Sequence, residues 1–203
     1  MSPDQIQALA WDKQGGLLPA IVQDAGTGRV LMLGYMDRAA LEATLASGRV
    51  TFFSRSKQRL WMKGESSGDV LDLVRLEADC DADTLLVQAR PRGPTCHLGR
   101  DSCFPDAPGS FLAELGALVE ARERERPAGS YTTSLFEGGV RRAAQKVGEE
   151  GVETALAAVA QDDEALLGES ADLVFHLLVL LRSRGLGLDA VEAVLRQRHA
   201  APR

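Results

Sequence analysis

The sequence predicts an α+β protein, with a mainly-β N-terminal domain followed by an all-α C-terminal helical bundle. Its 203 residues exceed the roughly 100–150 of a typical domain, so two modest domains are expected. Apolar runs bounded by turn residues dominate the first half, whereas helical periodicity dominates the second. The prolines and glycine of Phe104–Ser110 separate the two textures. We therefore predict domains at 1–107 and 108–203.

The N-terminal elements begin with a hairpin. A turn signal at 25–28 joins strands at Ala20–Asp24 and Arg29–Tyr35. Asp37 then caps a helix that runs to Ser47 and stops at Gly48. Further strands are expected at Val50–Ser54, Leu60–Met62, Val70–Ala78 and Thr84–Ala89, with a turn-rich loop at Gly64–Asp69.

The C-terminal half predicts enough helices for a small bundle. They are expected at Phe111–Arg126, Gly138–Ala160, Glu164–Arg184 and Leu188–His199. No apolar run approaches the ~20 residues that span a bilayer, and the start lacks a secretory signal, so a cytoplasmic location is expected. A net charge of −6 argues against general nucleic-acid binding but permits small phosphorylated substrates.

The segment Asp79–Asp83 combines carboxylates with a thiol. If it continues a strand, Asp79, Asp81 and Asp83 share one face and Cys80 takes the other. Crowded carboxylates repel one another unless a cation neutralises them, and oxygen ligands suit Mg²⁺. A solvated acidic turn explains this segment alone equally well.

The cysteines total three, an odd number that argues against a disulfide framework. Cys80, Cys96 and Cys103 form a soft set suited to zinc, with a fourth position open for an activated water. Three unrelated buried thiols are the alternative, because no Cys-x-x-Cys pair is present. His97 is a fourth ligand, a general base or an ordinary loop histidine.

Four segments of this half carry a specific resemblance, namely Phe53–Ser56, Leu60–Gly68, Asp79–Asp83 and Cys96–Phe104. Together they resemble the phosphoribosyl-AMP cyclohydrolases of histidine biosynthesis, over about Leu17–Phe104. The resemblance implies hydrolytic opening of the purine ring between N1 and C6. It also implies an intertwined homodimer, with zinc bound by Cys80 of one subunit and Cys96 and Cys103 of the other. Mg²⁺ would be bound by Asp79, Asp81 and Asp83.

The same resemblance suggests roles for other polar residues. His97 becomes a candidate catalytic residue for proton transfer, and Trp61 stacks on a base or, as we favour, fills the core. Leu98 stands where threonine is usual, a departure that touches no ligand. The candidate donors to substrate phosphates are Ser54, Arg55, Lys63, Ser66 and Ser67.

Carboxylates recur at helical spacing in the second half. Glu149, Glu150 and Glu153 share one broad helix face, and Lys146 lies a turn earlier. Glu169 and Asp172 lie three apart on the next predicted helix. Two such helices facing each other can hold Mg²⁺ on a phosphate chain, whereas either helix alone is better explained as a solvated acidic face.

This paired pattern resembles the all-α nucleotide pyrophosphohydrolases. Gly129–Thr132, Lys146–Glu153 and Ala171–His176 look most like phosphoribosyl-ATP pyrophosphatase, over about Gly109–His199. The resemblance implies Mg²⁺-dependent cleavage between the α and β phosphates. Its implied ligands are Glu149, Glu150, Glu153, Glu169 and Asp172, with Lys146 as a candidate catalytic residue. His176 is interpreted as a satisfied core residue.

The two resemblances support each other, since the product of the pyrophosphatase is the substrate of the cyclohydrolase. The leading hypothesis is therefore a bifunctional, homodimeric enzyme acting on phosphoribosyl-ATP and phosphoribosyl-AMP, with Zn²⁺ and Mg²⁺ as cofactors. One alternative makes the helical domain a general nucleoside triphosphate pyrophosphohydrolase. Another makes the three cysteines a structural zinc clamp in a dimeric binding module.

Overall fold

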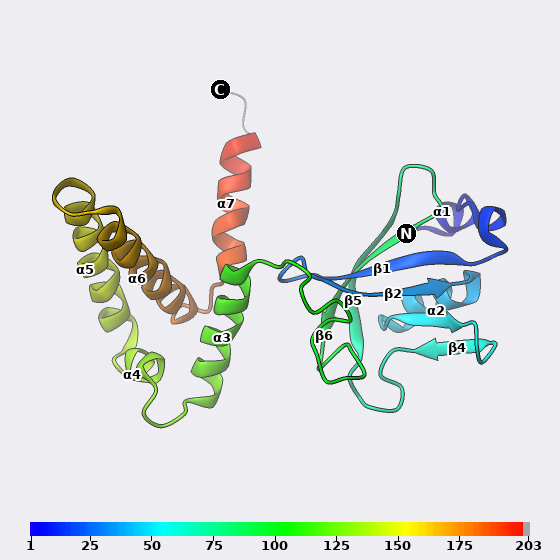
Figure 1. Cartoon of the computed structure of the whole chain (residues 1–203), viewed down its shortest axis with the longest axis horizontal. Coiled ribbons are helices and arrows are strands. Elements are labelled where there is room, and N and C mark those ends of the chain that lie inside the picture. Colours follow the sequence, from blue (N-terminus) through cyan, green and yellow to red (C-terminus); the bar gives the residue numbers. More distant parts are fainter. Residues whose placement is uncertain (201–203) are drawn as a thin grey trace. The chain divides into compact units, whose positions relative to one another are not determined.

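The computed structural model describes residues 1–200, and the chain divides into two compact units (Figure 1). The sheet unit comprises Met1–Phe111, and the helical unit begins at Leu112. Strands are confined to the first unit, while the second contains only helices and their connections within the described residues. The predicted α+β class is thus confirmed. Within residues 1–200, no helix has both the length and the apolar character needed to cross a membrane.

The sheet unit is organised around a four-stranded sheet of order β2-β1-β6-β5. Antiparallel pairing joins β1 to β2 and β5 to β6, while β1 and β6 run parallel. A separate antiparallel ribbon consists of β3 and β4. The strand bounds are Leu18–Asp24 (β1), Val30–Met36 (β2), Thr51–Ser54 (β3), Arg59–Met62 (β4), Leu71–Ala78 (β5) and Leu85–Pro91 (β6).

The helix α2 (Arg38–Ser47) covers this core. The Asp37 side chain accepts a hydrogen bond from the backbone N–H of Ala40 at 2.7 Å, which satisfies a free donor at the helix start. Gly48 adopts φ 68°, the left-handed conformation that ends a helix without a Cβ clash. The core beneath α2 alternates along the strands, with Leu18, Ala20 and Val22 of β1 fully buried. The predicted hairpin and helix are confirmed.

The helical unit contains α3 (Phe111–Glu125), α4 (Tyr131–Glu137), α5 (Gly139–Ala160), α6 (Asp163–Arg182) and α7 (Leu188–Ala200). The long helices α5 and α6 pack side by side (Figure 1). Ala143 and Ala157 are the buried apolar residues of α5, and small side chains let two helices approach closely. The core also contains Val119, Leu135, Phe136, Leu178 and Val179.

Three short helices were not predicted from the sequence. These are α1 (Pro3–Gln7), the 3₁₀ helix η1 (Trp11–Gln14) and α4. A helix of four to seven residues completes too few turns to display an apolar stripe, so the periodicity criterion does not detect it. Local capping was the available signal for α1 and α4, since Ser2 and Ser130 each accept a hydrogen bond from the first helical turn.

Candidate active sites

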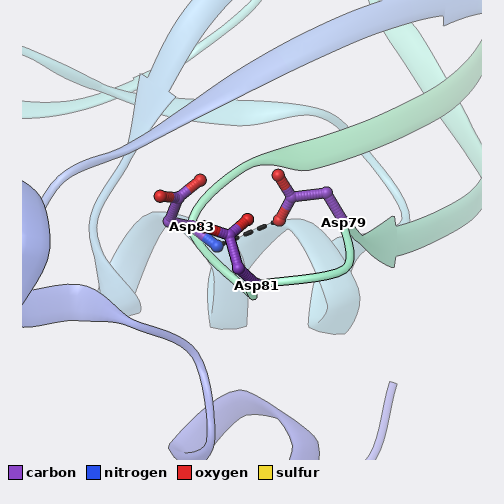
Figure 2. Close-up of side chains that lie close together, drawn as sticks. All are labelled: Asp79, Asp81 and Asp83. Carbon is purple, nitrogen blue, oxygen red and sulfur yellow. Dashed lines mark hydrogen bonds between the residues drawn. The ribbon is translucent and has the colours of Figure 1, made fainter.

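The acidic segment after β5 is a turn rather than a continuing strand, so the predicted alternation of Asp79, Asp81 and Asp83 against Cys80 is wrong. Ala82 adopts φ 61°, and the chain reverses into β6. The carboxylates nevertheless converge, with one oxygen from each aspartate within 4.8 Å of the others (Figure 2). Asp79 closes the turn by accepting hydrogen bonds from the Asp83 N–H at 3.0 Å and the Thr84 N–H at 3.1 Å.

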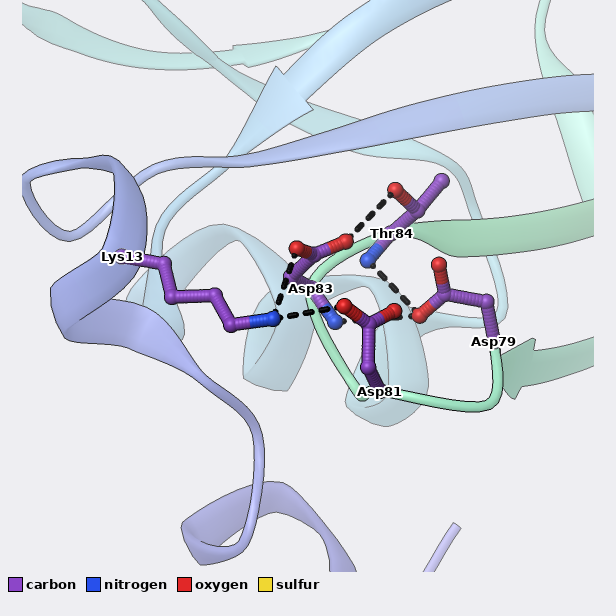
Figure 3. Close-up of polar contacts among 5 residues, drawn as sticks. All are labelled: Lys13, Asp79, Asp81, Asp83 and Thr84. Carbon is purple, nitrogen blue, oxygen red and sulfur yellow. Dashed lines mark hydrogen bonds and ion pairs between the residues drawn. The ribbon is translucent and has the colours of Figure 1, made fainter.

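Lys13 supplies positive charge to this turn from η1 (Figure 3). Its Nζ lies 2.6 Å from Asp81 Oδ2 and 3.0 Å from Asp83 Oδ2. Hydrogen bonds to these two carboxylates raise the pKa of Lys13, and the Lys13 ammonium in turn lowers the pKa of Asp81. An oxygen-only ligand set that already attracts a cation fits a hard ion such as Mg²⁺. No sequence signal pointed to Lys13, which lies 68 positions from Asp81.

Two of the thiols lie at a different place, around a cavity of about 580 Å³. Cys96 and Cys103 line it, and Cys96 Sγ lies 4.0 Å from His97 Nδ1. Partial loss of hydration raises the pKa of the Cys103 thiol, and the neighbouring Cys96 raises it further. Two neighbouring thiols suit a soft cation, which would stabilise their thiolate forms. The predicted substrate residues Trp61, Lys63, Ser66 and Ser67 line the same cavity.

Cys80 does not join the other two thiols within one chain. Among residues 1–200, no cluster of potential metal ligands contains Cys80, Cys96 and Cys103 together. Cys80 belongs to the turn where Ala78 pairs with Leu85, whereas the cavity adjoins the opposite end of the β5–β6 ladder. The seven residues of β6 span about 20 Å at roughly 3.3 Å per residue. One copy of the chain therefore does not bring the three cysteines together.

A second cavity borders the first and contains the predicted residues Ser54 and Arg55. The Arg55 guanidinium lies 4.0 Å from the ring centroid of Tyr35, a cation–π contact that sequence reasoning missed. Trp61 lines both cavities and also stacks on the buried Phe52, with ring centroids 5.7 Å apart. The two interpretations of Trp61, core and binding surface, are compatible with this position.

The helical unit brings three carboxylates together across α5 and α6. Oxygens of Glu150, Glu169 and Asp172 lie within 4.8 Å of one another. Glu150 is only 4% exposed, and its Oε1 contacts Lys146 Nζ at 2.6 Å. That contact lowers the pKa of Glu150 and raises the pKa of Lys146. A buried carboxylate next to two more requires further positive charge, so this group also fits Mg²⁺.

The other two predicted carboxylate ligands differ in position. Loss of hydration and the charges of Glu150 and Glu169 raise the pKa of Glu153, which places Glu153 beside the group. Glu149 instead contacts Lys146 Nζ at 3.0 Å and accepts a hydrogen bond from Gln145 Nε2 at 2.6 Å. The structure therefore does not bring Glu149 into the three-carboxylate group.

Comparison with known proteins gives each unit a counterpart. The family Phosphoribosyl-AMP cyclohydrolase matches residues 32–105, and the family Phosphoribosyl-ATP pyrophosphohydrolase matches residues 112–199. The Histidine biosynthesis bifunctional protein HisIE of Xanthomonas axonopodis pv. citri is 71% identical over 97% of this chain and 95% of its own length. The HisIE protein of Yersinia pestis is 54% identical over 98% of both chains.

The chain belongs to the HisIE family. It is a bifunctional enzyme of histidine biosynthesis, with phosphoribosyl-AMP cyclohydrolase and phosphoribosyl-ATP pyrophosphohydrolase activities. The hypothesis of successive hydrolases is thus confirmed. HisIE relatives match the helical unit as well as the sheet unit, which gives no support to a general nucleotide pyrophosphatase.

Proposed function

We propose that ring opening takes place at the thiols and aspartates of domain 1–107, and that pyrophosphate release takes place at the carboxylates of domain 108–203. For ring opening, the main supporting observation is that Cys80 lies apart from Cys96 and Cys103 in one chain, so that two copies are needed to bring the three thiols together. A second copy would remove this separation. Each complete cyclohydrolase site would then combine the 79–84 turn of one copy with the cavity of the other.

Within this site, Cys80 of one subunit and Cys96 and Cys103 of its partner copy would hold zinc. Asp79, Asp81 and Asp83 would hold Mg²⁺, with Lys13 displaced from Asp81 and Asp83. Zinc would supply a bound water of lowered pKa, and Mg²⁺ would supply positive charge beside the substrate phosphate. The three aspartates lie close together, and Cys96 lies beside Cys103, which supports a division into hard and soft ligands.

The chain's own residues then orient phosphoribosyl-AMP. Lys63 and Arg55 bind phosphate, with hydroxyl donors from Ser54, Ser66 and Ser67. Trp61 stacks on the purine, because its ring lines both cavities. His97 delivers a proton to N1 as the N1–C6 bond opens, which its exposed position beside Cys96 permits.

In the helical unit, Mg²⁺ would be held by Glu150, Glu169 and Asp172. Glu153 would lie beside the metal. The metal would neutralise the triphosphate chain and activate a water for cleavage between the α and β phosphates. Lys146 acts as a positioning residue, because its ammonium binds Glu150 Oε1 at 2.6 Å and balances one negative charge.

Complementation between two inactive variants tests the shared site. Cys80→Ser and Cys96→Ser should each abolish ring opening while pyrophosphate release persists. When the two are co-expressed, random pairing makes half the dimers mixed, and each mixed dimer contains one intact site. About a quarter of the wild-type activity should return. No recovery, with mixed dimers verified by mass, would contradict a shared site. Ring opening that survives in either single variant would favour a purely structural clamp.

A further inference from the structure

His176 is a buried histidine of α6 whose two ring nitrogens both have partners. Nδ1 lies 2.8 Å from the backbone carbonyl oxygen of Asp172, and Nε2 lies 3.0 Å from the hydroxyl of Tyr131. A carbonyl oxygen only accepts hydrogen bonds, so Nδ1 carries the proton. In the neutral ring, Nε2 then has a free lone pair and the Tyr131 hydroxyl donates to it. These contacts determine the tautomer of His176.

The protonated nitrogen also faces the carboxylate group. His176 Nδ1 lies 3.5 Å from Glu150 Oε1, the same oxygen that Lys146 contacts. Both side chains of this pair are about 95% buried, so the contact is poorly screened by solvent. Glu150 is thus held from its own helix by Lys146 and from α6 by His176. Since His176 also binds the backbone of Asp172, one ring connects two of the three clustered carboxylate residues.

Tyr131 begins α4 and, although it is 55% exposed, its ring contacts two aromatic neighbours. Its ring stacks on Phe175, with centroids 6.4 Å apart, and meets the edge of the His176 ring at 88°. Ser130 caps the helix that Tyr131 begins. These ring contacts place the hydroxyl next to Nε2, and a rotation of the imidazole would break three contacts.

We propose that Tyr131 and His176 are positioning residues for pyrophosphate release, which fix the carboxylate of Glu150 so that Glu150, Glu169 and Asp172 can share one divalent cation. This inference rests on the proposed metal site of the helical unit. Such outer partners of metal ligands fix ligand orientation, and their loss typically costs about 10- to 100-fold in metal affinity. Tyr131 and His176 need not touch the substrate.

Metal binding by the full-length protein tests the proposal. Mn²⁺ is titrated calorimetrically into wild type, Tyr131→Phe, His176→Asn and His176→Gln, and Glu150→Gln identifies the heat that belongs to the helical unit. Asn keeps a donor near the Nδ1 position, whereas Gln places its amide near Nε2. Thr133→Val is the matched control, because it removes an α4 hydroxyl that is buried and has no partner among the described residues.

Tyr131→Phe and His176→Gln should raise the Mn²⁺ dissociation constant by about 10-fold or more, with His176→Asn closest to wild type and Thr133→Val unchanged. The Mg²⁺ concentration for half-maximal pyrophosphate release should rise in parallel, with kcat largely recovered at saturating Mg²⁺. A structural role alone would lower the melting temperature and leave the dissociation constant of the folded protein unchanged. That result would overturn the proposal.

Nitrogen NMR provides a signature independent of metal. The chain has three histidines, and the signal of His176 is the one missing from His176→Asn. We expect the Nδ1-protonated form in wild type and a changed tautomer balance in Tyr131→Phe. A neutral His176 ring that is protonated only at Nε2 in wild type would overturn the proposal. Failure of the proposed function is distinguishable, because Glu150→Gln would then retain Mg²⁺-dependent pyrophosphate release.

Discussion

The two carboxylate groups of this chain are assembled in opposite ways. Asp79, Asp81 and Asp83 come from a single turn, and the positive charge beside them comes from Lys13, 68 positions from Asp81. Glu150 and Asp172 come from different helices, and the positive charge beside Glu150 comes from Lys146, one helical turn before it. The aspartates are thus neighbours in the sequence, and their counterion is far away in it. The carboxylates of the helical group are spread over two helices, and the counterion of Glu150 is its neighbour in the sequence.

This difference indicates what each site depends on. The aspartate turn keeps its geometry as long as the β5–β6 hairpin forms, because its own backbone amides bind Asp79. The helical group exists only where α5 and α6 are correctly packed. We therefore expect substitutions at the helical group to affect folding and metal binding together, and substitutions at the turn to affect metal binding more selectively.

The largest expected effect comes from removing the buried charge of the helical group. Glu150→Gln should lower pyrophosphate release by about 10²- to 10³-fold, because it removes a preorganised charge from the proposed metal site. Ring opening should be retained, since Glu150 lies in the other unit. Glu149→Gln, the adjacent change outside the three-carboxylate group, is the control and should cost only a few-fold. Assays of both reactions on each variant decide this, and equal losses at both positions would contradict the assignment.

The pH dependence of stability should reveal the contribution of Lys146, the counterion that is close to Glu150 in the sequence. Because Lys146 lowers the folded-state pKa of Glu150, their contact stabilises the fold above the ordinary carboxyl pKa of about 4.3. That contribution is lost as the pH falls through the lowered pKa. Metal-free Lys146→Met should melt roughly 5 °C lower than wild type at pH 7, with the gap closing below pH 4. In circular dichroism melts, Lys146→Arg should have a melting temperature near that of wild type. If the melting temperature of Lys146→Met were lower by the same amount at every pH, the contact with ionised Glu150 would not be the cause.

The distant counterion should act as a competitor of metal. Lys13→Met leaves Asp81 and Asp83 without their ammonium, so Mg²⁺ should bind the sheet unit a few-fold more tightly. Calorimetric titration measures this change. Lys57→Met removes an equal charge from the turn between β3 and β4 and should leave the affinity unchanged. Weaker Mg²⁺ binding by Lys13→Met would mean that Lys13 holds the aspartates in position for the metal and does not compete with it.

The smallest expected effect concerns Glu153. Its folded-state pKa is raised, so the proton that it binds stabilises the fold at low pH, and this contribution is lost as the pH rises through the raised value. At pH 7 the ionised carboxylate is therefore unfavourable, and metal-free Glu153→Gln should melt about 1–2 °C higher. Mg²⁺ should narrow the difference. Melts with and without Mg²⁺ at pH 7 and pH 4 provide the check, and a lower melting temperature at pH 7 would refute the repulsion.

Much of the architecture followed from local rules. Asp37 and Gly48 bounded α2 correctly, because a capping carboxylate and a left-handed glycine act within one turn of the chain. The 3.6-residue period located α5 and α6 within two residues. At Asp79–Asp83 the same approach failed, since strand and turn both place alternate aspartates near one another, and only the left-handed Ala82 and the pairing of Ala78 with Leu85 distinguish them.

The sequence by itself determined the α+β class, the segments that carry the candidate metal ligands and the division of these ligands into soft and hard sets. Residue chemistry and periodicity are local properties. Only the tertiary structure decided that Cys80 lies apart from Cys96 and Cys103 and that Glu149 lies outside the carboxylate group of Glu150. It also decided that Lys13 contacts Asp81 and that Tyr131 contacts His176. These relations depend on how strands pair and helices pack. Contacts between residues far apart in sequence leave no spacing pattern from which to predict them.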